Sequence, residues 1–188
     1  MYHPLLLLLG FWYIFPSYVA NGFAVFSKFI KSRHSIDNGR LLRDGQPIFG
    51  PGKSWEGFFI GFISGVLFGI AQLLTAPFLL QIIEQYLVLP SELYPIVLLS
   101  SPLVLLIALG ALIGDILGSF LKRRLKIPRG KPAPFIDQLD FLVVSLLFGA
   151  IVYPLPLVHI LFLLVVTPLI HLLANVIGYL LRVKQVPW

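Results

Sequence analysis

The sequence predicts an all-α integral membrane protein, one domain over residues 1–188, with five transmembrane helices and two basic loops on one side. Three observations support this prediction. Of its 188 residues, 58% are hydrophobic and only 12% are charged, whereas soluble domains average about 25% charged residues. Five segments approach the length of about 20 apolar residues that a helix needs to cross the hydrocarbon core. The basic residues gather in alternate connections between these segments.

The first two predicted spans cover about residues 5–26 and about residues 55–80. The opening stretch, MYHPLLLLLGFWYIF, has neither the basic start nor the small-residue cleavage site of a signal peptide. We therefore expect it to be retained as the first span, with Pro16 inside it.

The remaining spans are predicted at about residues 94–121, 134–153 and 157–181. The fourth is long enough only if two carboxylates in its first turns, Asp137 and Asp140, are counted as part of it. Two prolines make its connection to the fifth span short and sharp.

Glycines recur once per helical turn in two of the predicted spans. The second span carries Gly57, Gly61, Gly65 and Gly69, and the third carries Gly110, Gly114 and Gly118. Small residues four positions apart let helices approach closely in lipid. We expect the second and third spans to pack on each other or on a second copy of the chain, which leaves a homodimer open.

All 14 basic residues fall on one predicted side of the membrane. They lie in the loops at about residues 27–54 and 122–133 and in the tail, at Arg182 and Lys184. The charged residues on the opposite side are all acidic. The positive-inside rule therefore places the N-terminus outside and the C-terminus in the cytoplasm. On a membrane protein the net charge of +6 favours orientation or anionic ligands over nucleic acid.

Three aspartates lie near the cytoplasmic ends of two predicted spans. Asp115 is about 9 Å of helical rise before the end of the third span. Asp137 and Asp140 occupy the first turns of the fourth, where the helix dipole favours negative charge. Taken singly, they would be explained by an ion pair of Asp115 with Lys122 or Arg123 and by two helix-start carboxylates.

Taken together, three carboxylates at one depth beside a loop rich in cations favour a binding site. Carboxylate oxygens hold Mg²⁺, which shares its coordination with substrate phosphates, and Lys and Arg neutralise the remaining phosphate charge. Ser119 and Lys122 lie on the same helical face as Asp115. The pattern predicts phosphoryl or nucleotidyl transfer between a lipid and a soluble substrate at the membrane boundary.

The stretch GPGKSWEG, residues 50–57, resembles a P-loop but is not one, because Pro47 stands where its first glycine is required. Two interpretations stay open. Ser54 could cap the second span, or the glycines could let the backbone approach a phosphate that Lys53 reaches. Asn21, an amide in the first span, could likewise bond a neighbouring helix or a ligand.

Five short motifs occur in order along the chain: PSYVAN at 16–21, DNGR at 37–40, DG at 44–45, GPGKSWEG at 50–57 and GDILGSFLKRR at 114–124. Together with DQLD at 137–140, they resemble the phosphatidate cytidylyltransferase family, and most of all its archaeal branch, the CDP-archaeol synthases. The bacterial signature has Arg at the place of Gln138 and a preceding His-Gly-Gly run, both absent here.

The resemblance implies that CTP and 2,3-bis-O-geranylgeranylglycerol 1-phosphate react in the presence of Mg²⁺ to give a CDP-activated lipid and pyrophosphate. It implies that Asp115 and Asp137 hold the metal and form the catalytic set with Lys122. The substrate-binding residues that it implies are Asn21, Lys53, Ser119, Arg123, Arg129 and Asp140.

Two other functions would require features that the sequence lacks. A CDP-alcohol phosphotransferase would need Ala and Arg where Ile48 and Phe49 follow the Asp44–Gly45 pair. A small anion or phosphate transporter would need polar groups along a route across the membrane and a site near the midplane. The ionisable residues within the spans instead cluster in the cytoplasmic half.

Overall fold

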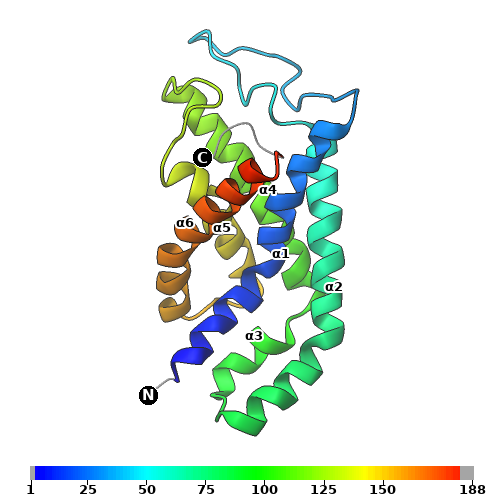
Figure 1. The fold of residues 1–188 in the computed structure, drawn as a ribbon, viewed down its shortest axis with the longest axis vertical. Coiled ribbons are helices and arrows are strands. Elements are labelled where there is room, and N and C mark those ends of the chain that lie inside the picture. Colours follow the sequence, from blue (N-terminus) through cyan, green and yellow to red (C-terminus); the bar gives the residue numbers. More distant parts are fainter. Residues whose placement is uncertain (1–2, 183–188) are drawn as a thin grey trace.

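The computed structural model describes residues 3–182, which form helices joined by loops (Figure 1). The elements are η1 (Pro4–Leu8), α1 (Leu9–Ala24), η2 (Val25–Phe29), α2 (Trp55–Tyr86), η3 (Ser91–Leu93), α3 (Tyr94–Leu98), α4 (Ser101–Arg124), α5 (Ile136–Gly149) and α6 (Leu157–Leu180). Within the described residues, β structure is limited to two isolated bridges. The predicted all-α class is confirmed, while Lys184 of the basic tail lies outside the described residues.

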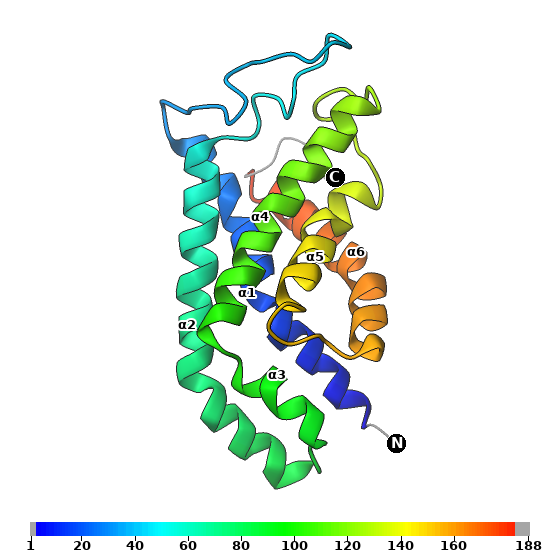
Figure 2. The same cartoon turned by 180° about the vertical axis from the view of Figure 1, so that it is seen from behind.

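Among the residues that the structure describes, four helical segments are long and apolar enough to cross a membrane, one fewer than the sequence predicted. They are Pro4–Phe29, Trp55–Tyr86, Ser101–Arg124 and Leu157–Leu180. The predicted fourth span contains only α5, whose 14 residues rise by about 21 Å, against a hydrocarbon core of about 30 Å. Figure 2 shows α5 lying along α4 and ending well short of the far end of the bundle.

The predicted third span is divided into α3 and α4. Pro102 has no N–H to bond the carbonyl of Leu98, and its ring would clash with that carbonyl in a continuous helix. Leu99 instead takes a positive φ of 42°, and α4 begins two residues later. The expected span from residue 94 was therefore wrong at its start, because its apolar pattern continues through the proline that ends the helix.

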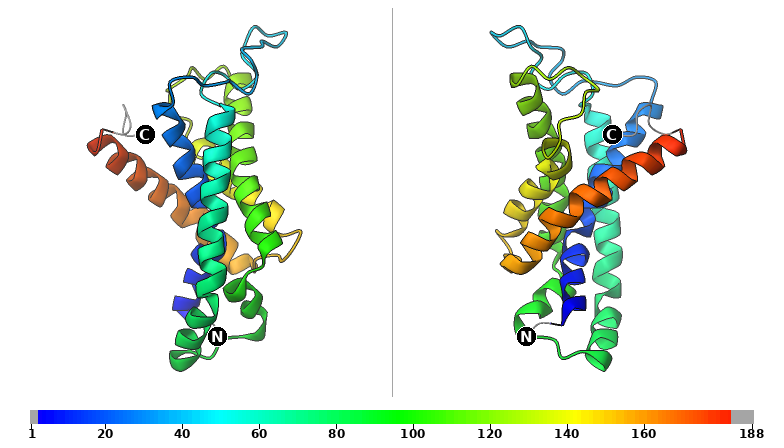
Figure 3. Two further views of the ribbon diagram at one scale, coloured as in Figure 1. Left: turned by 90° about the vertical axis from the view of Figure 1, so that its right-hand side faces the viewer. Right: turned by 60° about the vertical axis from the view of Figure 1, so that its left-hand side comes forward.

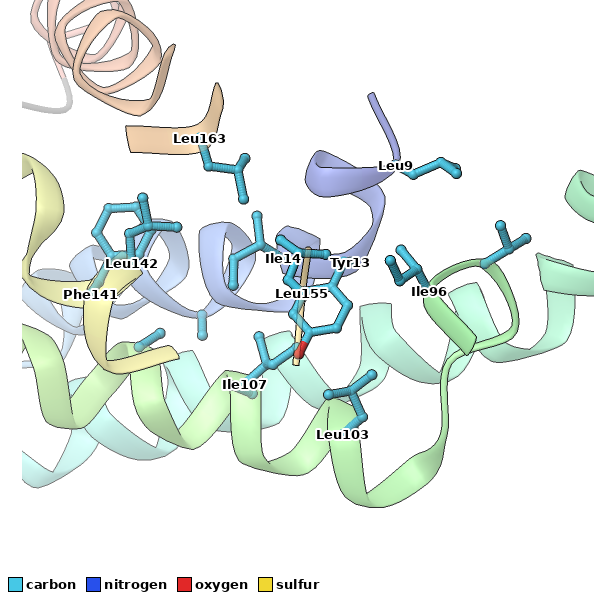
Figure 4. Packing of buried hydrophobic residues seen from close by; sticks show 14 of the residues in the cluster. Leu9, Tyr13, Ile14, Ile96, Leu103, Ile107, Phe141, Leu142, Leu155 and Leu163 are labelled. Carbon is cyan, nitrogen blue, oxygen red and sulfur yellow. The ribbon is translucent and has the colours of Figure 1, made fainter. Parts of the chain in front are cut away.

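The apolar core surrounds α1. Figure 4 shows Tyr13 and Ile14 of α1 among apolar side chains from α3, α4, α5 and α6, including Ile96 and Leu163. The Tyr13 hydroxyl donates to the carbonyl of Tyr153 at 2.7 Å. This bond satisfies a buried hydroxyl and ties α1 to the connection between α5 and α6.

Pro16 leaves the carbonyl of Trp12 without its helical donor, because proline has no N–H. Gln72, a buried residue of α2, donates its Nε2 to this oxygen at 2.7 Å. Unsatisfied backbone groups are costly in lipid, so a proline in a membrane helix needs such a neighbour. The bond therefore stabilises the packing of α2 on α1.

The glycine stripes allow close helix contacts, as predicted, and the partners agree in part with the prediction. A methyl group on Gly61 of α2 would lie 2.6 Å from the carbonyl oxygen of Ala20 in α1 and 2.8 Å from Leu112 in α4. A methyl group on Gly110 of α4 would lie 2.8 Å from the Cα of Ser145 in α5. The α2–α4 contact is confirmed, whereas the α4 stripe packs on α5, so both stripes are occupied within one chain.

Candidate active site

A cavity of about 810 Å³ lies at the end of the bundle that carries the two basic loops. Its walls come from α1, η2, the start of α2, α4, α5 and α6 and from both loops. Figure 3 shows that α6 diverges from the other helices toward this end. The hydroxyl of Tyr18 on α1 lies 2.6 Å from that of Thr167 on α6, so the two helices are joined before they separate.

Six of the nine residues proposed from the sequence line this cavity. They are Asn21, Lys53, Asp115, Lys122, Arg129 and Asp137. The other three, Ser119, Arg123 and Asp140, are not among its lining residues, and Ser119 is buried at 5% exposure. The fold therefore brings together side chains that lie more than a hundred positions apart in the sequence.

Each aspartate of the cavity wall pairs with a lysine. Lys53 donates its Nζ to Oδ2 of Asp115 at 2.5 Å, which joins the first loop to α4. Lys122 pairs with Oδ1 of Asp137, which joins α4 to α5. The pairing of Asp115 with Lys122 or Arg123 that the sequence left open is therefore wrong.

These ion pairs are accessible to a ligand. Their four side chains are between 18% and 28% exposed. Because they line one cavity, two carboxylates and two ammonium groups face the same space. Such an arrangement offers oxygen ligands for a cation and positive charge for an anion at one place.

The third carboxylate, Asp140, lies behind this wall. Its side chain packs against the backbone of Gly118 in α4. Its Oδ1 accepts the backbone N–H of Phe141 at 2.7 Å, and it interacts electrostatically with Asp115 and Lys53. Asp140 therefore contributes to the charge balance of the site from within the α4–α5 contact.

The carboxylates fit a metal ion whose coordination is completed by substrate phosphates. Among residues 3–182, no three Asp, Glu or His side chains are grouped to hold a metal ion by themselves. Protein-bound Mg²⁺, however, is commonly held by one or two carboxylates together with substrate phosphates and water. Asp115 and Asp137 provide that number of carboxylates beside cations suited to phosphate.

Further polar residues of the wall were missed in the sequence. Lys28, Arg33 and Lys131 line the cavity, as do His171 and Asn175 of α6. Within α6, Nδ2 of Asn175 lies 3.2 Å from Nδ1 of His171. Twelve cations share the two loops, and only the fold shows which of them face the cavity.

Part of the cavity wall is apolar. It is lined by Val25, Phe26, Ile170, Ala174, Ile177 and Leu181. These residues belong to η2 and to the diverging end of α6. A ligand with a charged head and apolar chains would therefore find both environments in the same cavity.

The start of α2 accommodates both interpretations of GPGKSWEG. Ser54 is the N-cap of α2, because its Oγ accepts the N–H of Gly57 at 3.2 Å. The preceding Gly52 and Lys53 line the cavity. The helix cap is therefore confirmed, and it fixes the chain next to the lysine that reaches Asp115.

Arg124 holds the first loop on the end of α4. Its Nη1 donates to Oδ2 of Asp44 at 2.6 Å, and its Nη2 donates to the carbonyl of Pro47. Its guanidinium lies 5.3 Å from the ring of Phe120, which also packs against Phe49. One arginine of the cluster after α4 is thus engaged in loop structure.

Comparison with known proteins identifies relatives over the whole chain. The profile of the family described as "CarS-like: CDP-archaeol synthase" matches residues 2–188. The CDP-archaeol synthase of Pyrococcus furiosus is 44% identical over 99% of both chains. That of Methanocaldococcus jannaschii is 39% identical over 97% of this chain and 98% of its own.

A solved structure shares the fold. It is described as "Structural insight into an intramembrane enzyme for archaeal membrane lipids biosynthesis" and is 34% identical, with a TM-score of 0.67 over 88% of this chain and 92% of its own. The resemblance predicted from the motifs is confirmed by these matches. Their identity and coverage show that this chain belongs to the CDP-archaeol synthase family.

Proposed function

We propose that the cavity is the active site of a cytidylyltransferase that transfers CMP from CTP to the archaeal lipid phosphate 2,3-bis-O-geranylgeranylglycerol 1-phosphate. Family membership supplies the reaction, a CTP-dependent cytidylyl transfer. The placement of the active site rests on one observation: Asp115 and Asp137, each beside a lysine, lie in the wall of one cavity.

Asp115 and Asp137 would hold Mg²⁺ together with the triphosphate. When bound there, Mg²⁺ would neutralise phosphate charge and orient the reacting oxygens. Lys53 and Lys122 each place a positive charge beside one of the carboxylates, and Arg129 can bind phosphate oxygens bidentately. The catalytic set is therefore built for positioning and charge stabilisation, the main requirements of transfer at phosphorus.

The reaction needs no obvious proton-transfer base. A phosphate oxygen of the lipid attacks the α-phosphorus of CTP in line, and the bond from this phosphorus to the bridging oxygen of the β-phosphate breaks. Pyrophosphate leaves with that electron pair. Because a phosphate monoester is already an anion near neutral pH, its oxygen can attack without first losing a proton to the protein.

The lipid substrate would enter from the side, between α1 and α6. The two helices diverge toward the basic end (Figure 3), and the wall there includes apolar side chains such as Ile170 and Ile177. Asn21 of α1 also lines the cavity, where it could contact phosphate or nucleotide. The isoprenoid chains would remain against the apolar part of the wall while the phosphate of the lipid reaches Lys53 and Lys122.

The three proposed residues behind the wall would act indirectly. Ser119 is buried in α4, and Asp140 packs on the glycine just before it. Arg123 is partly buried at the end of the same helix. We assign them to shaping the α4–α5 contact and its charge, in place of direct substrate binding.

The active site would face the cytoplasm of the cell membrane. Both basic loops lie at one end of the bundle and the N-terminal helix starts at the other (Figure 1), an arrangement that the positive-inside rule orients with the N-terminus outside. In this topology the chain passes five times, and α5 with its connection forms a short fourth pass. The C-terminal end of α6 then lies on the cytoplasmic side.

The function is tested with purified protein in lipid nanodiscs. The lipid phosphate is supplied with CTP, ATP, GTP or UTP, with and without Mg²⁺, and lipid product and pyrophosphate are quantified together. We expect CDP-lipid and pyrophosphate in equal amounts when CTP and Mg²⁺ are both present, and neither product with another nucleotide or without Mg²⁺. Phosphate flux into vesicles without any product would instead indicate a transporter, and consumption of CDP-lipid with an added alcohol would indicate a CDP-alcohol phosphotransferase.

A further inference from the structure

Asp37 is a buried carboxylate in the first basic loop, only 4% exposed. Its Oδ1 accepts the hydroxyl of Ser35 at 2.6 Å and the N–H of Gly39 at 3.0 Å. Its Oδ2 accepts the N–H groups of Phe49 at 2.9 Å and Gly50 at 2.7 Å. One carboxylate thus joins two parts of the loop that are far apart in the sequence.

The segment that Asp37 holds ends at Lys53, which lines the proposed active site. Gly50 adopts a φ of 90°, which side-chain-bearing residues rarely adopt, and its carbonyl accepts the N–H of Lys53 at 3.2 Å. The carbonyl of Lys53 in turn accepts the N–H of Ile36, the neighbour of Asp37, at 2.9 Å. The backbone of Lys53 is therefore held on both sides by residues that Asp37 ties together, while its Nζ reaches Asp115.

We propose that Asp37 is a positioning residue of the reaction, which fixes the Gly50–Lys53 segment so that the Lys53 ammonium stays beside Asp115. The inference rests on the proposed function and deepens it. A lysine side chain has four flexible carbons and much rotamer freedom. Holding its backbone limits the positions that the ammonium can reach, and misplacement by about 1 Å can cost about a hundredfold in rate.

The charge of Asp37 matters because four donors converge on it. Burial alone would raise the pKa of Asp37, but the hydrogen bonds from Ser35, Gly50, Phe49 and Gly39 lower it to about 2. An amide in its place offers a single acceptor oxygen and turns an NH₂ group toward backbone N–H donors. Asp37→Asn therefore keeps the shape of the residue while breaking the link between the two parts of the loop.

The same loop contains a matched control. Asp44 also accepts the N–H of the residue two positions on, Gln46, at 3.1 Å. It is exposed, however, and its other oxygen bonds Arg124 at the end of α4. Asp44→Asn therefore makes the same chemical change in the same loop without touching the segment that carries Lys53.

The test is a double-mutant cycle on kcat and KM for CTP. We expect Asp37→Asn to lower kcat/KM by about ten- to a hundredfold, Lys53→Met to lower it at least as much, and Asp44→Asn to change it by less than about threefold. Because Asp37 acts through Lys53, the double variant should be no slower than Lys53→Met alone. Losses that multiply in the double variant would overturn the proposal.

One further variant, Ser35→Ala, and the activity of Lys53→Met itself keep the outcomes distinct. If Asp37→Asn does not fold, Ser35→Ala removes one of the four bonds and should give a smaller loss that also disappears in the Lys53→Met background. If Ser35→Ala still lowered the activity in the Lys53→Met background, the proposed link between Asp37 and Lys53 would be overturned. Full activity of Lys53→Met would instead remove Lys53 from the site, which contradicts the proposed function itself and not only the part assigned to Asp37.

Discussion

At the scale of single residues, the site is organised by two lysine–aspartate pairs. Partly exposed ion pairs contribute only about 0–1 kcal/mol to stability, and these side chains are 18–28% exposed. Their contribution to folding is therefore small. Their placement in one cavity is better explained by the proposed binding of a metal and a polyphosphate than by a contribution to folding stability.

Replacing Lys122 tests this distinction. Lys122→Met should lower kcat by about a hundredfold or more, the usual cost of losing one preorganised charge at a transition state, with little change in melting temperature. Lys126→Met is the control, because Lys126 is exposed and outside the cavity wall. Steady-state kinetics and thermal unfolding in detergent provide the two readouts. Equal kcat for the two variants would remove Lys122 from the catalytic set.

The sequence indicated several of these residues but not their partners. Asp115, Lys53 and Asp137 stand out because charges are rare in an apolar chain. Their pairing depends on how the first loop folds over α4, which no local pattern encodes. Asp37 was visible only as part of the DNGR motif, since hydrogen bonds to the backbone of Phe49 and Gly50 leave no signature in residue spacing.

At the scale of elements, close helix contacts place the carboxylates. The glycines of α4 bring α5 close enough for Asp140 to pack on Gly118, and the same contact sets Asp115 and Asp137 in one wall. The glycines of α2 bring that helix against α1 and α4. The position of the site therefore depends on small residues that bear no functional group.

Gly61→Ala tests the contact of α2 with its neighbours. The added methyl group would lie 2.6 Å from a backbone oxygen of α1, and overpacking of this kind typically costs about 1–3 kcal/mol. We expect a lower melting temperature than wild type in detergent micelles. Gly22→Ala is the matched control, because a methyl group there meets no atom within 4 Å. A Gly61→Ala variant as stable as Gly22→Ala would show that this packing is looser than the structure indicates.

Element boundaries were predictable where apolar pattern and helix signals agree. Ser54 marks the start of α2, and the first and last long helices lie close to their predicted ranges. The errors concern α3 and α5. A hydropathy profile shows that residues are apolar, but it does not show that Pro102 lacks the N–H that a continuous helix needs. For α5, it extends the predicted span over residues after Gly149 that the structure places in a turn.

At the scale of the whole molecule, the fold brings two kinds of substrate to one boundary. The basic loops and helix ends form a charged end of the bundle, and the divergence of α6 from α1 opens an apolar side into the same cavity (Figure 3). The core around Tyr13 and Ile14 fills the bundle beyond it. This arrangement suits a reaction between a soluble nucleotide and a lipid that stays in the membrane.

The most direct test of the central claim is binding of Mn²⁺, as a probe for Mg²⁺, to the protein–CTP complex, measured by electron paramagnetic resonance. Wild type and Asp44→Asn should bind Mn²⁺ in the presence of CTP with equal affinity, whereas Asp115→Asn and Asp137→Asn should each bind it at least about tenfold more weakly, since each loses one carboxylate ligand. Mn²⁺ bound as tightly by both of these variants as by wild type would contradict the claim that the two aspartates jointly hold the metal.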